Sequence, residues 1–137
     1  MTICIKLGDW PPVKGSPAVW RALPVSDKEL SAVRELLDLD EAYILDITSD
    51  PRIKKLNCSP FADLPSLNAA AEALSHFTPE QLQAVSAFCQ HGEDLCEAVR
   101  NVANGAYRFW PCAEEPEGDG VYIQTEDGFV QIYVPQS

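Results

Sequence analysis

The stretch that decides the fold runs from Asp63 to Gly105 and reads DLPSLNAAAEALSHFTPEQLQAVSAFCQHGEDLCEAVRNVANG. Its apolar residues recur every three or four positions in three successive segments, which predicts three short amphipathic helices joined by tight turns. The second helix begins at Thr78, where a threonine N-cap, a proline at the first helical position and Gln81 satisfy amide N–H groups that would otherwise be unpaired. Gly92 ends this helix, and Asp94 begins the third.

Most of this stretch carries only negative charge. No lysine or arginine occurs between Leu56 and Val99, whereas six acids do: Asp63, Glu72, Glu80, Glu93, Asp94 and Glu97. Since the apolar positions are expected to face inward, this three-helix unit should be apolar inside and purely acidic outside.

The charge of the whole chain is distributed unevenly. Of the net charge of −11 over 137 residues, residues 1–55 contribute −1 and residues 56–137 contribute −10. Such a surface repels nucleic acid and membrane headgroups and attracts basic partners. The alternative reading is that the acids only keep a cytoplasmic protein in solution.

The composition indicates a folded cytoplasmic protein. The 46% hydrophobic content favours a globular chain, and no apolar run reaches the roughly 20 residues that cross a bilayer. The first residues also lack a basic region followed by an apolar segment, so no export signal is expected. Five cysteines at irregular spacings are therefore expected to be reduced thiols, several of them in the core.

One group of residues has ligand chemistry that suits zinc. Cys89, His91 and Cys96 lie close together in the sequence, but their C-x-H-x4-C spacing lacks a C-x2-C pair. Cys89 also falls on the expected buried face of its helix. The pattern favours a structural role, and no metal or cofactor is expected.

Residues 1–55 predict a small sheet with one covering helix. Strands are expected over residues 2–7, 18–23 and 42–48, with a proline-broken loop over residues 10–17. Ser26 begins a capping box, and the helix that follows it runs to about residue 37. Its expected buried residues are Leu30, Val33, Leu36 and Leu37.

Residues 49–63 are expected to form a linker. This linker carries a basic cluster of Arg52, Lys54 and Lys55. Three roles are open for the cluster: it binds an anion, it is solvated, or it faces the acidic part of the molecule. After the helices, residues 106–110 predict a strand and residues 114–120 an acidic loop. Residues 121–125 and 129–134 flank Asp127-Gly128, which predicts a β-hairpin with one buried face.

The fold class is therefore α+β: a sheet-plus-helix unit (1–55), a three-helix acidic unit (56–105), and a strand with a C-terminal β-hairpin (106–137), within one compact chain. The sequence contains no phosphate-binding loop, dinucleotide-binding turn, H-E-x-x-H or G-x-S-x-G motif. His76 and His91 fall at helix ends, where a histidine commonly complements the helix dipole. We therefore expect a protein that is not an enzyme.

The order of several short motifs resembles the ArdA antirestriction proteins of conjugative plasmids, transposons and phages. The motifs are WRALP (20–24), YILD (43–46), LNAAAEAL (67–74), TPEQL (78–82), GEDLCEAV (92–99) and NGAY (104–107). The resemblance covers roughly residues 18–110. Where typical members carry a third acidic helical region, this chain has an acidic loop and a hairpin.

This resemblance implies a non-catalytic DNA mimic that occupies the DNA-binding cleft of a type I restriction–modification enzyme or of another DNA-binding protein, usually as a homodimer. Carboxylates four residues apart on a helix lie about 6 Å from each other and can imitate successive phosphates. The partner-binding residues would be Glu72, Glu80, Glu93, Asp94, Glu97, Glu114, Glu115 and Glu117. The alternative is a non-catalytic interaction module of a mobile genetic element that does not mimic DNA.

Overall fold

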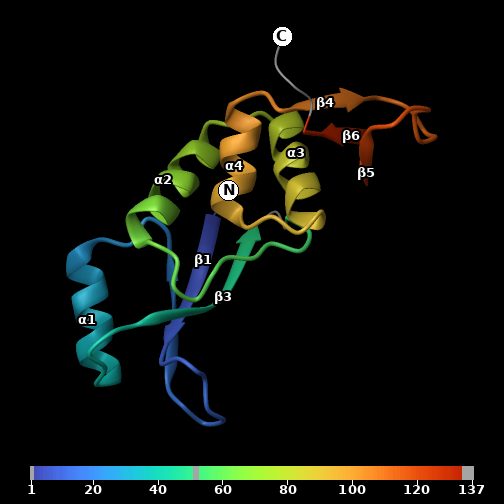
Figure 1. Cartoon of the computed structure of the whole chain (residues 1–137). Helices are drawn as coiled ribbons and strands as arrows, with labels where there is room; N and C mark the ends of the chain where they lie inside the picture. Colours follow the sequence, from blue (N-terminus) through green and yellow to red (C-terminus); the bar gives the residue numbers. More distant parts are fainter. Residues whose placement is uncertain (1, 51–52, 134–137) are drawn as a thin grey trace.

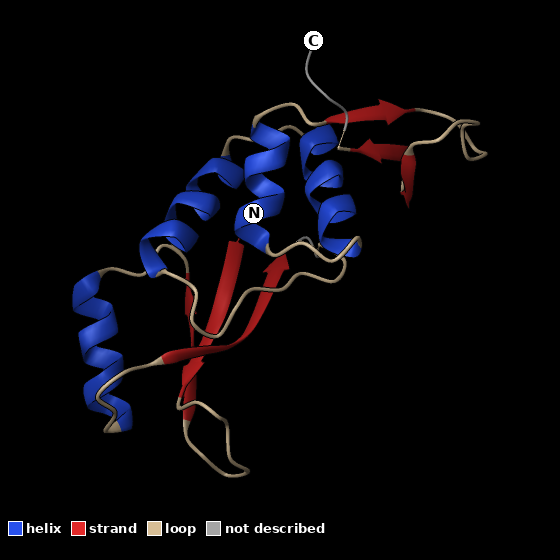
Figure 2. Ribbon diagram, in the orientation of Figure 1, coloured by secondary structure: helices blue, strands red, loops and turns tan. Residues whose placement is uncertain are grey.

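Three helices lie between two small antiparallel sheets in a computed structural model that describes residues 2–50 and 53–133 (Figures 1 and 2). In chain order the elements are β1 (Thr2–Gly8), β2 (Ala18–Ala22), α1 (Asp27–Leu37), β3 (Tyr43–Asp50), α2 (Leu64–Ser75), α3 (Pro79–Gln90), α4 (Leu95–Ala103), β4 (Tyr107–Trp110), β5 (Val121–Thr125) and β6 (Gly128–Ile132). The predicted α+β class and the C-terminal hairpin are confirmed.

The first sheet has the order β2-β1-β3, with β1 antiparallel to both neighbours. Alternate side chains of β1 point into the core, so that Ile3, Ile5 and Leu7 are buried while Lys6 is only half-buried. This alternation is the pattern of a strand with one face against the core. The linker expected from residue 49 begins later, because Ser49 and Asp50 still pair with β1.

Helix α1 begins as predicted at Ser26, whose hydroxyl accepts a hydrogen bond from the Glu29 amide. Val33 and Leu37 are buried in one core cluster with the β1 side chains. The prediction that Leu36 is buried is wrong, since its side chain is 65% exposed. Successive helical residues are rotated by about 100°, and Leu37 already takes the inward position.

Helices α3 and α4 begin at the predicted caps, and the structure adds a cap for α2. Thr78 and Gln81 form both bonds of the capping box, while Asp63 and Asp94 cap α2 and α4. Helix α3 is the most deeply buried, because it packs against α4 and against all three strands of the second sheet. Its residues with at most 1% exposure are Ala84, Val85, Ala87, Phe88 and Cys89.

The second sheet has the order β4-β6-β5, so the predicted strand and hairpin form one sheet. Val130 pairs with residues of both neighbouring strands and is fully buried, and Ile132 is 3% exposed. The predicted buried face is therefore present on β6, whereas Val121 of β5 is 39% exposed. Val134, predicted on the same hairpin, lies outside the described residues.

Buried side chains from all three predicted units form one continuous core cluster, which extends from Ile3 to Ile132. In the part of the chain that the structure describes, no helix has the length and apolar character that crossing a bilayer requires.

Two leucine-to-alanine substitutions test this core. Leu67 in α2 is fully buried and Leu36 in α1 is 65% exposed. Leu67→Ala removes buried methyl groups and leaves a cavity, so it should lower the free energy of unfolding by about 3 kcal/mol. Leu36→Ala should change it by less than about 0.5 kcal/mol. Urea unfolding measures both, and equal losses would contradict the assigned core.

Candidate functional site

The tight turn between α3 and α4 brings three of the predicted site residues to one helix end. Gly92 adopts a positive φ of 109°, which favours glycine, and the Glu93 amide donates to the Phe88 carbonyl at 3.1 Å. Asp94 is the N-cap of α4, and its carboxylate accepts from the Glu97 amide at 2.9 Å. The helix dipole favours negative charge at this position.

Glu93 lies one residue before the N-cap, so the helical spacing to Glu97 expected from the sequence does not apply to it. Glu93 is half-buried. Its carboxylate accepts a hydrogen bond from the side-chain amide of Asn101 at 2.8 Å and another from the Tyr133 hydroxyl. Partial burial, the bond to Glu93 and the charges of Glu93 and Glu97 raise the pKa of Tyr133 to about 12. The charges of Glu93 and Glu97 therefore both act on the Tyr133 hydroxyl.

Two further acids reach the start of α4 from other elements. The Leu95 amide donates to the Asn57 carbonyl at 2.9 Å, which places the segment after β3 against the helix end. Burial raises the pKa of the neighbouring Cys58 to about 11, with the charges of Asp94 and Asp46 adding to the effect after that of Cys96.

Cys96, in the first turn of α4, is also close to several acids. Burial and the charges of Asp94, Asp63 and Glu97 raise its pKa, against an opposing effect of Arg100. We define the α4 acidic surface as the five acids whose charges act on Cys58, Cys96 or Tyr133: Asp46, Asp63, Glu93, Asp94 and Glu97. Asp46 is not among the residues predicted for the site. Its only signal in the sequence is its place at an exposed position of the alternating β3 strand.

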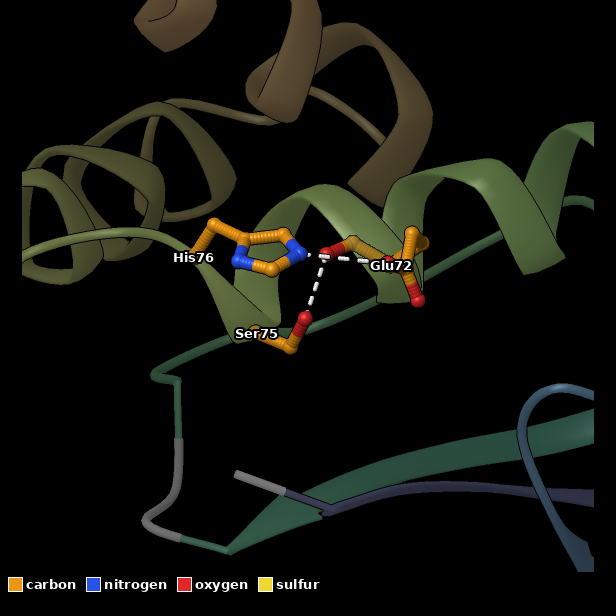
Figure 3. Close-up of polar contacts among 3 residues, drawn as sticks. All are labelled: Glu72, Ser75 and His76. Atoms are coloured by element: carbon orange, nitrogen blue, oxygen red, sulfur yellow. Dashed lines mark hydrogen bonds and ion pairs between the residues drawn. The ribbon is translucent and has the colours of Figure 1, made fainter.

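Glu72 does not belong to this surface. It lies on α2 and faces solvent, with its carboxylate 3.1 Å from the His76 ring nitrogen (Figure 3). The side chains of Glu72 and His76 are 73% and 74% exposed. The Glu72 carbonyl also accepts a hydrogen bond from the Ser75 hydroxyl at 2.6 Å.

The remaining predicted site residues lie apart as well. Glu80 is in the first turn of α3, and Glu93 follows the last; a helix of 12 residues separates the two positions by about 18 Å. Glu80 instead lies near Tyr107, whose pKa rises chiefly through burial and then through this charge. Three exposed acids lie on the loop between β4 and β5, beyond the far end of the second sheet in Figure 1: Glu114, Glu115 and Glu117.

Basic residues lie near the α4 acidic surface without forming ion pairs with it in the part of the chain that the structure describes. Over residues 2–50 and 53–133, the pair Glu72–His76 is the one ion pair within 4 Å, and it involves no lysine or arginine. Lys54 and Lys55 are exposed and border a hollow of about 760 Å³ that Asp46 and Trp20 also line. Arg52, the third member of the predicted basic cluster, lies outside the described residues.

The residues considered for zinc are not arranged as a metal site. Cys89 is buried in the core, while the exposed His91 ring makes an edge contact with Tyr133 at 5.5 Å between centroids. Within the described part of the chain, no three His, Cys, Asp or Glu side chains are grouped to hold a metal ion. His76 and His91 are the C-cap residues of α2 and α3, as their sequence positions predict.

Comparison of the chain with models of known protein families and with curated protein sequences gave no match. The resemblance to the ArdA proteins therefore rests on the order and spacing of the motifs given above.

The thiols around the α4 acidic surface should react slowly with alkylating reagents. Burial, with the charges of Asp94 and Glu93, raises the pKa of Cys89 to about 12, so at pH 8 only about one thiol in 10,000 is ionised. Cys112 is exposed on the loop after β4. Iodoacetamide at pH 8 should label Cys112 at least tenfold faster than Cys89, as measured by peptide mass spectrometry. Equal rates would contradict the burial of Cys89.

Proposed function

We propose that this chain is an ArdA-like antirestriction protein, an acidic DNA mimic that inhibits a type I restriction–modification enzyme or another DNA-binding protein. The observation that carries the proposal is the α4 acidic surface, whose carboxylates from β3, the α2 cap, the α3–α4 turn and α4 act on the neighbouring thiols Cys58 and Cys96. No lysine or arginine forms an ion pair with these carboxylates among the residues that the structure describes.

The charge density of this surface suits a DNA-binding cleft. Duplex DNA presents one phosphate charge per about 1.7 Å of its axis, and the proteins that bind it hold lysine and arginine side chains to meet that charge. A group of five carboxylates can occupy several such side chains at once. Association would be fast and would weaken as salt screens the charges.

The proposed mimic would occupy only a short part of a DNA-binding cleft. The α4 acidic surface supplies the carboxylates, whereas Glu72, Glu80 and the acids of the β4–β5 loop lie apart from it. The chain would therefore compete for a few phosphate-binding positions rather than for the length of a bound duplex. A second chain in a homodimer would extend the occupied part of the cleft.

The second candidate is an interaction module that binds its partner without mimicking DNA. The dispersal of Glu72, Glu80, Glu114, Glu115 and Glu117 favours it, since acids spread over several faces keep a protein in solution whatever it binds. The two candidates differ in whether binding depends on where the charge lies.

Two isosteric triple variants with the same change in charge separate these candidates. Glu93→Gln/Asp94→Asn/Glu97→Gln neutralises the α4 acidic surface, and asparagine still caps the helix. Glu114→Gln/Glu115→Gln/Glu117→Gln is the matched control on the β4–β5 loop. Binding to a type I methyltransferase core at low salt, with and without competing duplex DNA, is the measurement.

The first variant should bind at least tenfold more weakly, which is about 1.4 kcal/mol, and the control should bind as the parent chain does. Duplex DNA should displace the parent chain. Equal losses in both variants, or binding that duplex DNA leaves unchanged, would contradict DNA mimicry.

A further inference from the structure

Three aromatic rings from distant parts of the sequence meet on the surface beside the first sheet. The Phe61 ring makes edge contacts with Trp10 and with Tyr43, at centroid distances of 5.7 Å and 5.6 Å. Phe61 is 64% exposed, Trp10 is 40% exposed and Tyr43 is half-buried. This aromatic patch is defined here as Trp10, Tyr43 and Phe61.

The backbone holds the patch in place. β3 is an edge strand, and on its free side the Ile44 amide donates to the Pro60 carbonyl at 3.1 Å. The Phe61 amide donates to the Ser59 hydroxyl at 3.1 Å, and the Trp10 amide donates to the Asp9 carboxylate at 2.9 Å. The bond from Ile44 to Pro60 therefore joins the segments that carry Tyr43 and Phe61. Aromatic side chains are enriched in protein interfaces.

Carboxylates border the patch on the side of Tyr43. A shallow cavity of about 370 Å³ is lined by Asp9, Asp38, Leu39, Asp40, Glu41 and Tyr43. The Tyr43 hydroxyl donates to the Glu41 carboxylate at 3.0 Å, and the bond and charge of Glu41 raise the pKa of that hydroxyl, with smaller effects of burial and of Asp9. Tyr43 therefore belongs both to the aromatic patch and to the lining of the acidic cavity.

One base lies nearby. Arg34 lines a neighbouring hollow with Asp38 and Asp40, and its guanidinium donates to the Ser31 hydroxyl at 3.1 Å. Within the described ranges it makes no ion pair with these acids inside 4 Å. The carboxylates of the cavity are therefore available to a cation from outside.

We propose that the aromatic patch and its acidic cavity bind an arginine side chain of a basic peptide segment. A guanidinium is planar, stacks on aromatic faces and donates several hydrogen bonds to carboxylates. Trp10 and Phe61 offer the aromatic surface, while Glu41 and its neighbours offer the acceptors. An anionic segment would be repelled by the four carboxylates, and a purely apolar segment would leave them unpaired or desolvated.

Titration of the isotope-labelled chain with a short peptide, acetyl-Gly-Arg-Gly-Arg-Gly-amide, tests the proposal by NMR. The readout is the indole N–H signal of Trp10, with the same peptide carrying citrulline or lysine as comparison. The arginine peptide should shift this signal and bind at least tenfold more tightly than the citrulline peptide, which has nearly the same shape without the charge.

Variants assign the site. Phe61→Leu keeps an apolar side chain at an exposed position but removes the ring, and it should weaken binding about tenfold. Glu41→Gln should weaken it several-fold, and Leu36→Ala, an exposed apolar change on α1, should have no effect. Thermal unfolding confirms that each variant is folded.

The α4 variant Glu93→Gln/Asp94→Asn/Glu97→Gln should leave the response of Trp10 unchanged, which separates this site from the proposed DNA mimic. The proposal is overturned if the Trp10 signal does not move, if the citrulline or lysine peptide binds as tightly, or if Phe61→Leu binds as the parent chain does.

Discussion

The burial of helix α3 on several sides is the constraint on which the rest of the structure depends. Phe88 is fully buried, and the small residues Ala84 and Ala87 let α4 and the second sheet approach the helix closely. The Phe88 ring contacts Tyr133 at 5.2 Å between centroids, and the Tyr133 hydroxyl donates to Glu93. Apolar packing in the centre thereby fixes the position of a carboxylate at the surface.

The α4 acidic surface holds like charges close together, which costs free energy unless other groups offset it. The helix dipole and the Glu97 amide stabilise Asp94, and the Asn101 amide and the Tyr133 hydroxyl stabilise Glu93. These neutral donors keep the carboxylates in place without cancelling their charge. Under the proposed function, a cationic partner would relieve the repulsion that remains.

Local signals in the sequence predict the elements well, because caps and apolar periodicity act within a few residues. Thr78 with Gln81 and Asp94 cap helices as expected. The failures concern orientation and distant contacts. The helical spacing predicts a buried Leu36, although Leu37 holds the inward position. The bond from Tyr133 to Glu93 joins residues 40 positions apart. The contact of Phe61 with Trp10 likewise depends on tertiary packing, which no local pattern encodes.

The central claim is that the start of α4 is the face that meets a DNA-binding protein. Hydrogen–deuterium exchange of the chain, free and bound to a type I methyltransferase core, tests this claim most directly. The account predicts slower exchange of amides around residues 93–101 and 57–63 in the complex, and recovery of the free rates when duplex DNA is added. Protection confined to α2 or to the β4–β5 loop, with these segments unchanged, would contradict it.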